Sequence, residues 1–250
     1  MTWQLNGNLA TGKVLLADNT AFEVTLDTHR TGPGIAAMQF GGKPLDGFWQ
    51  EITGNLFASP PEIQEVYVRG SDVICHYAEQ KESELTPTIY WSLDSTDDLH
   101  AIQLDVRIAV QTSTLGTQPE TQIQWHWPEG QHRELALTES LIDQLTQELT
   151  QPLPYLDPSV AENYRLGLIH FESADVVLLP MVHLSDYAGE QFESPTNHLV
   201  LNQKLSLPLL EKGVIRTARI RCLIAPSSLS DAELLQQTLG YFQSTLPLAT

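Results

Sequence analysis

The chain has 250 residues, of which 31 are Asp or Glu and 13 are Lys or Arg, so its formal net charge is -18. Because nucleic acids and anionic membrane surfaces attract proteins through Lys and Arg, this charge balance argues against both as partners. Hydrophobic residues make up 42% of the chain, which is typical of a globular rather than a disordered protein.

Alternation of apolar and polar residues dominates the first half of the chain and predicts half-buried antiparallel strands. In residues 21–27, for example, Phe22, Val24 and Leu26 share one face. The other predicted strands of this half are residues 13–17, 63–69, 72–79, 88–93, 99–111 and 122–127. Gly70-Ser71 is a two-residue hairpin signal, and residues 112–121 are predicted to form a loop. Trp49 is expected on another loop, where it could cap a pocket.

A polar sheet face is the strongest candidate for a binding site. We expect strand 99–111 to pair with strand 122–127 through the loop between them, with Trp125 and Trp127 in the core. The opposite face would then gather Gln103, Asp105, Arg107, Gln111, Gln122, Gln124 and His126. Amides, a carboxylate, a guanidinium and an imidazole supply the hydrogen bonds that a sugar requires. An ordinary solvated sheet face is the alternative.

The second half combines strands with two segments of helical period. Strands are predicted at residues 166–171, 175–179, 198–203 and 214–225, and helices at residues 138–150 and 230–243. The second helix begins with a capping box from Ser230 to Glu233. Residues 151–158 contain three prolines and are the best linker candidate. We expect one all-β domain, a large antiparallel β-sandwich with two peripheral amphipathic helices, and an internal division at residues 151–158 as the alternative.

Histidines and carboxylates of the second half are candidates for proton transfer. His170 and Glu172 would lie on one side of a strand, and His183, Asp186 and His198 follow within 30 residues. Such a set could bind zinc or manganese, but no pair has the i, i+4 spacing of a helical metal site, so we predict no metal. We name His126, His170 and Glu172 as candidate catalytic residues, able to act as general acid and base on a sugar.

Cations concentrate in residues 204–225, which contain five Lys or Arg and one Glu. Alternation places Arg219 and Arg221 on one face of the predicted strand. Guanidinium groups match carboxylates, so this pair could clamp an anion or an acidic sugar. The alternative is that the strand lies in the interior of a sheet and its arginines pair with acidic neighbours.

Several signatures are missing from the sequence. It has no glycine-rich phosphate loop, no GxSxG elbow and no HExxH motif, so we predict no nucleotide and no other cofactor. Cys75 and Cys222 lie in apolar strands, where we expect buried reduced thiols, with a disulfide between core strands as the alternative. Residues 1–8 lack the basic and apolar regions of a secretory signal, so we expect a cytoplasmic protein.

Two resemblances add to this interpretation. The stretches YVRGSD (67–72), PTIYW (87–91) and LEKGVIR (210–216) resemble segments of uncharacterised proteins of planctomycete type, which implies a bacterial source. The long run of alternating strands resembles the galactose-mutarotase-like supersandwich, a sugar-binding fold that uses two histidines and a glutamate on a concave sheet. Those catalytic motifs have no residue-by-residue match here, so the resemblance favours carbohydrate without assigning catalytic residues.

These observations predict a carbohydrate-related protein that binds a sugar on a polar sheet face. The expected ligand-binding residues are Gln103, Asp105, Arg107, Gln124, Arg219 and Arg221. If the protein is also an enzyme, the expected reaction is proton transfer to or from the sugar, as in mutarotases and epimerases. The alternative is a noncatalytic interaction protein, which would carry a flat apolar patch instead.

Overall fold

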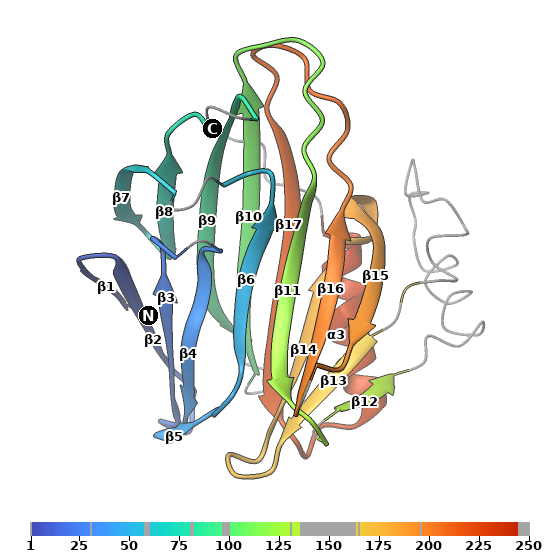
Figure 1. The fold of residues 1–250 in the computed structure, drawn as a ribbon. Coiled ribbons are helices and arrows are strands. Elements are labelled where there is room, and N and C mark those ends of the chain that lie inside the picture. Colours follow the sequence, from blue (N-terminus) through green and yellow to red (C-terminus); the bar gives the residue numbers. More distant parts are fainter. Residues whose placement is uncertain are drawn as a thin grey trace.

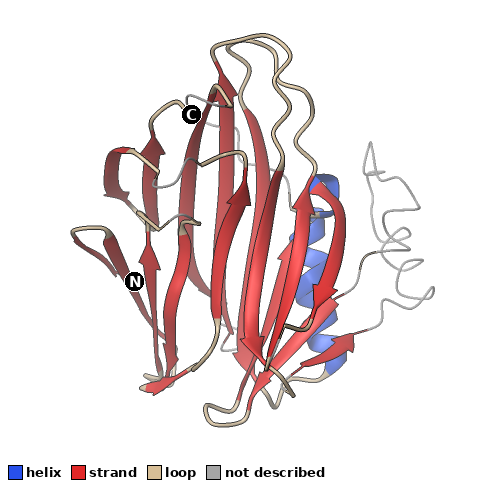
Figure 2. Ribbon diagram, viewed as in Figure 1, coloured by secondary structure: helices blue, strands red, loops and turns tan. Residues whose placement is uncertain are grey.

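Two layers of antiparallel strands pack face to face (Figures 1 and 2). The computed structural model describes residues 2–30, 32–57, 61–80, 83–96, 101–130, 132–135, 164, 166–195 and 197–244. The predicted all-β sandwich is therefore confirmed. No helix in these residues is long and apolar enough to cross a membrane.

The front layer contains two sheets. The first has the order β1 (Thr2–Asn6), β2 (Leu9–Leu15), β3 (Ala21–Asp27), β4 (Gly34–Phe40) and β5 (Lys43–Pro44). The second has the order β15 (Tyr187–Glu193), β16 (His198–Leu205), β11 (Thr121–Pro128) and β6 (Trp49–Gly54). In Figure 1, β4 lies beside β6, so the two sheets follow one another in a single layer.

A glycine permits this junction between the two front sheets. A Cβ atom at Gly34 would lie 2.1 Å from the backbone oxygen of Gln50, a distance no other residue could accommodate without a backbone shift. Nearby, the backbone N–H of Ile52 donates to the carbonyl of Pro33 at 3.2 Å. Close backbone approach is one of the positions where glycine is required.

The back layer is one continuous sheet. Its order is β12 (His132–Leu135), β13 (Leu166–Phe171), β14 (Val176–Val182), β17 (Arg216–Pro226), β10 (Ala101–Thr112), β9 (Leu85–Thr96), β8 (Asp72–Tyr77) and β7 (Ile63–Arg69). Gly70 and Ser71 join β7 and β8, and Gly70 has a φ of +60°. This is the hairpin that the sequence predicted, because only a residue tolerant of positive φ suits such a turn.

One apolar core fills the space between the layers. Trp91, Trp125 and Trp127 are its largest fully buried side chains, and truncating one of them to alanine would cost about 3–5 kcal/mol. Cys75 and Cys222 are buried free thiols, as predicted. Burial raises the pKa of Cys75 to about 11, so this thiol stays protonated.

Helix α3 (Asp231–Gln243) confirms the second predicted helix. Its capping box forms as expected: Glu233 N–H donates to Ser230 Oγ at 3.3 Å, and Ser230 N–H donates to Glu233 Oε2 at 2.8 Å. Figure 1 places α3 against the outer face of the back sheet, behind β13 and β14. The other predicted helix, residues 138–150, and the linker candidate, residues 151–158, lie outside the described residues.

The predicted pairing of strand 99–111 with strand 122–127 is wrong. β10 lies between β9 and β17 in the back layer, whereas β11 lies between β6 and β16 in the front layer. The loop between them crosses the sandwich, whose layers pack only about 10 Å apart. Alternation correctly directed Trp125 and Trp127 into the core, but it does not specify the neighbouring strand. The expected polar face is consequently divided between the outer faces of two opposite layers.

Candidate functional site

A cleft of about 310 Å³ opens on the outer face of the back sheet, beside the C-terminal end of α3. We call it the arginine cleft. Its lining includes three arginines, two tyrosines and two aspartates: Arg107, Arg219, Arg221, Tyr90, Tyr241, Asp72 and Asp105. Four residues predicted to bind a ligand, Asp105, Arg107, Arg219 and Arg221, thus line one cavity.

Strand register creates the arginine cleft. Side chains directly opposite one another on neighbouring strands lie on the same face. One row across the sheet contains Asp72, Ser92, Asp105 and Arg221, and the next contains Ile74, Tyr90, Arg107 and Arg219. Gln103, one row beyond Asp105, shares this face between Asp94 and Leu223 but is not among the residues that line the cleft.

Arg221 is bound to a carboxylate in the cleft. Its Nε donates to Asp105 Oδ1 at 2.5 Å and its Nη2 donates to Asp105 Oδ2 at 2.7 Å. The guanidinium also lies over the ring of Tyr241, with Cζ 4.5 Å from the ring centre. Such a bidentate pair fixes the plane of both groups, so Arg221 and Asp105 form a rigid wall.

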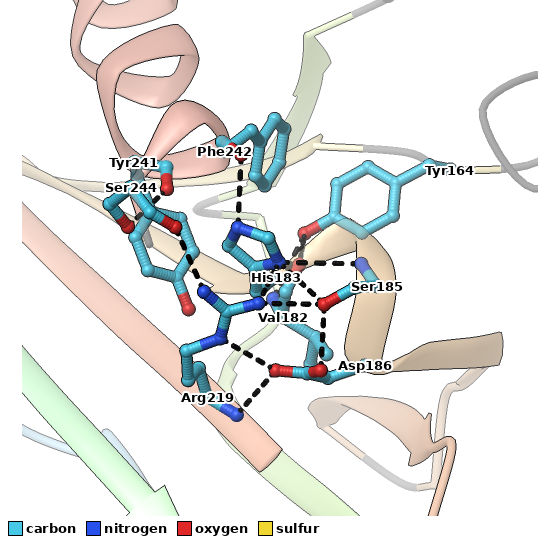
Figure 3. Close-up of polar contacts among 9 residues, drawn as sticks. All are labelled: Tyr164, Val182, His183, Ser185, Asp186, Arg219, Tyr241, Phe242 and Ser244. Carbon is cyan, nitrogen blue, oxygen red and sulfur yellow. Dashed lines mark hydrogen bonds and ion pairs between the residues drawn. The ribbon is translucent and has the colours of Figure 1, made fainter. Parts of the chain in front are cut away.

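Arg219 is held by a larger network (Figure 3). Its Nε donates to Asp186 Oδ2 at 2.9 Å, and its backbone N–H donates to the same oxygen at 2.9 Å. Its Nη2 contacts His183 Nδ1 and Ser185 Oγ, both at 2.6 Å, and its Nη1 donates to the carbonyl of Ser244 at 2.9 Å. Asp186 and Ser185 belong to the short 3-10 helix η1 (Leu184–Asp186), and His183 is its N-cap.

These contacts determine the protonation of His183. Its Nε2 lies 3.0 Å from the carbonyl of Phe242, which can only accept, so Nε2 carries the hydrogen. Nδ1 then accepts from the Arg219 guanidinium. Burial, and secondarily the charge of Arg219, lower the pKa of His183 to about 4. A neutral His183 therefore bridges β17 to the last turn of α3.

Tyr164 supports the same corner of the structure (Figure 3). Its hydroxyl donates to the carbonyl of Val182 and accepts from the N–H of Val182, both at 2.9 Å. Its ring packs edge-on against Phe242, with ring centres 5.5 Å apart. Burial raises the pKa of Tyr164 well above its ordinary value. The end of α3 is thereby fixed against the back sheet.

Arg107 differs from the other two arginines of the cleft. Its Cζ lies 4.1 Å from the centre of the Tyr90 ring. It makes no ion pair or hydrogen bond with any residue that the structure describes. The buried hydroxyl of Tyr241 likewise has no hydrogen-bond partner among those residues, and burial raises its pKa well above the ordinary value. The cleft lining therefore contains two donors without a described hydrogen-bond partner: the guanidinium of Arg107 and the buried, protonated hydroxyl of Tyr241.

The front layer carries a second polar group of residues, which we call the histidine face. It consists of Trp49, Glu51, Gln124, His126 and His198, on the outer face of β6, β11 and β16. The rings of Trp49 and His126 stack with centres 4.3 Å apart, and the ring of His198 lies 5.4 Å from that of Trp49. His126 Nε2 lies 3.3 Å from Glu51 Oε1.

Two features of the histidine face were not predicted. Trp49 begins β6 and does not lie on a loop, so that prediction is wrong. Glu51 was not named at all, although the alternation of Trp49, Glu51 and Thr53 was a readable signal. The adjacent His126 imidazole holds the pKa of Glu51 below its ordinary value.

The candidate catalytic residues do not converge. His170 and Glu172 line a pocket of about 740 Å³ on the back sheet, near Arg133. His170 Nε2 is buried there without a hydrogen-bond partner in the described part of the chain, while Arg133 pairs with Asp231. His126 lies on the opposite layer, so the three residues cannot act on one substrate. Alternation assigned each side chain to a face of its own strand, but it did not specify that β11 and β13 belong to different layers.

The possible metal ligands are also separated. His183 and Asp186 belong to the Arg219 network, and His198 lies on the histidine face. Across the described ranges, no three His, Cys, Asp or Glu side chains are grouped so that they could hold a metal ion.

Exposed apolar side chains bear on the interaction-protein alternative. The large ones in the described residues lie on the paired strands β1 and β2, on β7, and on two loops that contact each other: Leu5, Leu9, Leu15, Val68, Leu115, Leu209 and Ile215. Single exposed apolar residues are normal on soluble domains. No protein-family model and no curated protein matches this sequence.

Proposed function

We propose that this protein binds a sugar in the arginine cleft. The observation that carries the proposal is a cavity of about 310 Å³ whose lining holds the guanidinium of Arg107 and the buried hydroxyl of Tyr241, two donors without a hydrogen-bond partner among the described residues. Small-molecule sites begin at about this volume, 300 Å³, and orient their ligands with a few placed polar groups. A single sugar ring is a ligand of suitable size.

The remaining polar groups of the cleft suit sugar hydroxyls. Asp72 and Ser92 can accept hydrogen bonds, and Asp105 keeps lone pairs beyond those used by Arg221. The Arg219 and Arg221 networks fix the walls before a ligand arrives. Preorganisation of this kind lowers the entropic cost of binding.

A panel of monosaccharides tests the proposal, with thermal unfolding and isothermal titration calorimetry as readouts. A ligand at about 100 times its dissociation constant stabilises a protein by about 2.7 kcal/mol. We expect Tyr241→Phe to weaken binding without loss of stability, because the hydroxyl has no described partner to lose.

Gln103→Ala is the matched control, since Gln103 shares the face of β10 but does not line the cleft. Absence of any bound sugar at millimolar concentration contradicts the proposal. Equal weakening by Tyr241→Phe and Gln103→Ala contradicts the location.

The histidine face supports a second candidate, mutarotase-like proton transfer of the kind that the supersandwich resemblance suggests. The favouring observation is the 3.3 Å contact between His126 and Glu51 beside the Trp49 ring. An imidazole next to a carboxylate can exchange a proton with a sugar oxygen. Polarimetry of freshly dissolved galactose is the measurement. We expect His126→Gln to abolish any acceleration, and a rate equal to that of buffer alone eliminates this candidate.

A further inference from the structure

We infer that the sugar of the arginine cleft is acidic and that Arg107 binds its carboxylate. The inference rests on the proposed sugar binding and names the class of ligand. It depends on which of the three arginines remains available to an anion.

Among the described residues, no carboxylate matches the charge of Arg107. In the strand register, Arg107 lies directly opposite Tyr90 on one side and Arg219 on the other. Arg219 is neutralised by Asp186 at 2.9 Å. The charge of Arg107 meets only the ring of Tyr90 within the described ranges. Two guanidinium groups on facing positions repel each other, so an anion beside Arg107 would relieve this repulsion.

The carboxylates near Arg107 are committed elsewhere. Asp105 directs both oxygens to Arg221, at 2.5 and 2.7 Å. Asp72 accepts from the hydroxyl of Ser71 at 3.2 Å and forms no ion pair with Arg107. The chain has 31 acidic residues for 13 Lys and Arg, so carboxylate partners are abundant. An arginine that lines a cavity without a described carboxylate partner is therefore a candidate for an external carboxylate.

The geometry of Arg107 suits a carboxylate in particular. A guanidinium that lies on an aromatic ring keeps its N–H groups in its own plane, where they can form two parallel hydrogen bonds to a carboxylate. The rest of the cleft offers groups for hydroxyls, from Tyr241, Ser92 and Asp72. A ligand that satisfies both needs is a sugar acid, such as a uronic acid.

Calorimetric titration of the full chain with glucuronate, glucose and acetate tests this inference. We expect glucuronate to bind at least about tenfold more tightly than either glucose or acetate, since a charge-assisted bidentate pair is about twice as strong as a neutral hydrogen bond. Arg107→Gln should remove the preference for glucuronate over glucose. Arg107→Lys should keep part of it, because an ammonium retains the charge but not the two parallel hydrogen bonds.

Lys204→Gln is the matched control, because it removes one exposed positive charge from β16 in the opposite layer. It should bind glucuronate as the unmodified protein does. Equal affinity for glucose and glucuronate would overturn the inference and leave the proposed function standing, whereas no binding of either sugar would overturn both. Acetate binding as tight as that of glucuronate would assign a simple anion site instead. If Arg107→Gln unfolds, an unchanged preference in Arg107→Lys overturns the role of the guanidinium.

Discussion

The two outer faces of the sandwich use polar residues in different ways. On the back sheet, Arg219 and Arg221 each bind a carboxylate, and α3 closes over one side of them. On the front sheet, the carboxylate of Glu51 lies 3.3 Å from the imidazole of His126, beside the stacked Trp49 ring. The back face is thus organised by charge pairs that hold the structure together, whereas the front face is organised by ring stacking and amides.

This difference locates the candidate binding group on the back face. Charged side chains in central strands are costly to bury unless they are paired. Asp186 and Asp105 meet that requirement for Arg219 and Arg221. Of the three arginines that line the cleft, Arg107 is the one without a carboxylate partner among the described residues.

The largest expected effect is the loss of Asp186. Asp186→Ala would leave Arg219 and its backbone N–H without their shared acceptor in a buried site, so we expect a loss of about 3–5 kcal/mol in the free energy of unfolding. Glu51→Ala is the matched change on the front face, where a partly exposed pair should contribute about 1 kcal/mol or less. Urea denaturation measures both. Equal losses would remove the contrast between the faces.

Acid should destabilise the back face through His183. Its pKa falls from 6.5 to about 4 on folding, so between these values the unfolded state binds more protons than the folded state. Stability is therefore fully present above about pH 6.5 and declines by about 3 kcal/mol as the pH falls to 4. Unfolding measured across this range should show a shallower decline for His183→Gln than for His126→Gln. Identical profiles for the two variants would show that His183 is not the titrating group.

A smaller effect is expected at the wall of the arginine cleft. Asp105→Asn removes the charge that faces Arg221, but the side chain of Asp105 is 40% exposed, and solvent moderates the penalty. We expect a loss of about 1–2 kcal/mol in the free energy of unfolding, measured by chemical denaturation. A loss as large as that of Asp186→Ala would mean that exposure does not distinguish the two pairs.

The smallest effect concerns an exposed pair next to the same sheet. Arg133 and Asp231 join β12 to the first turn of α3, and both side chains are about half exposed (51% and 50%). Arg133→Gln should cost about 0.5 kcal/mol or less, with little change in thermal midpoint. A loss above about 1 kcal/mol would show that α3 depends on this contact as well as on its buried C-terminal end.

Local sequence patterns predicted much of the fold. Alternation predicted the core faces of β3, β10 and β11, and the capping box predicted the start of α3. Strands β1, β4, β5, β6, β12 and β15 were missed, most of them because their alternation is short or interrupted. At the site, the prediction from sequence included Asp105, Arg107, Arg219 and Arg221. It did not include Tyr90 and Tyr241, because a single tyrosine in a sequence does not show whether it lines a cavity.

The sequence by itself determined which side of each strand is apolar, because a period of two follows directly from the strand backbone. It also determined the excess of carboxylates that makes an unpaired arginine unusual. Only the tertiary structure decided which strands are neighbours, and therefore that Gln124 and His126 lie on one layer while Asp105 and Arg107 lie on the other. Strand pairing depends on contacts between distant parts of the chain, which no local pattern encodes. For the same reason, only the folded chain could bring His183, Arg219 and the end of α3 together, and leave Arg107 without a carboxylate partner among the residues that the structure describes.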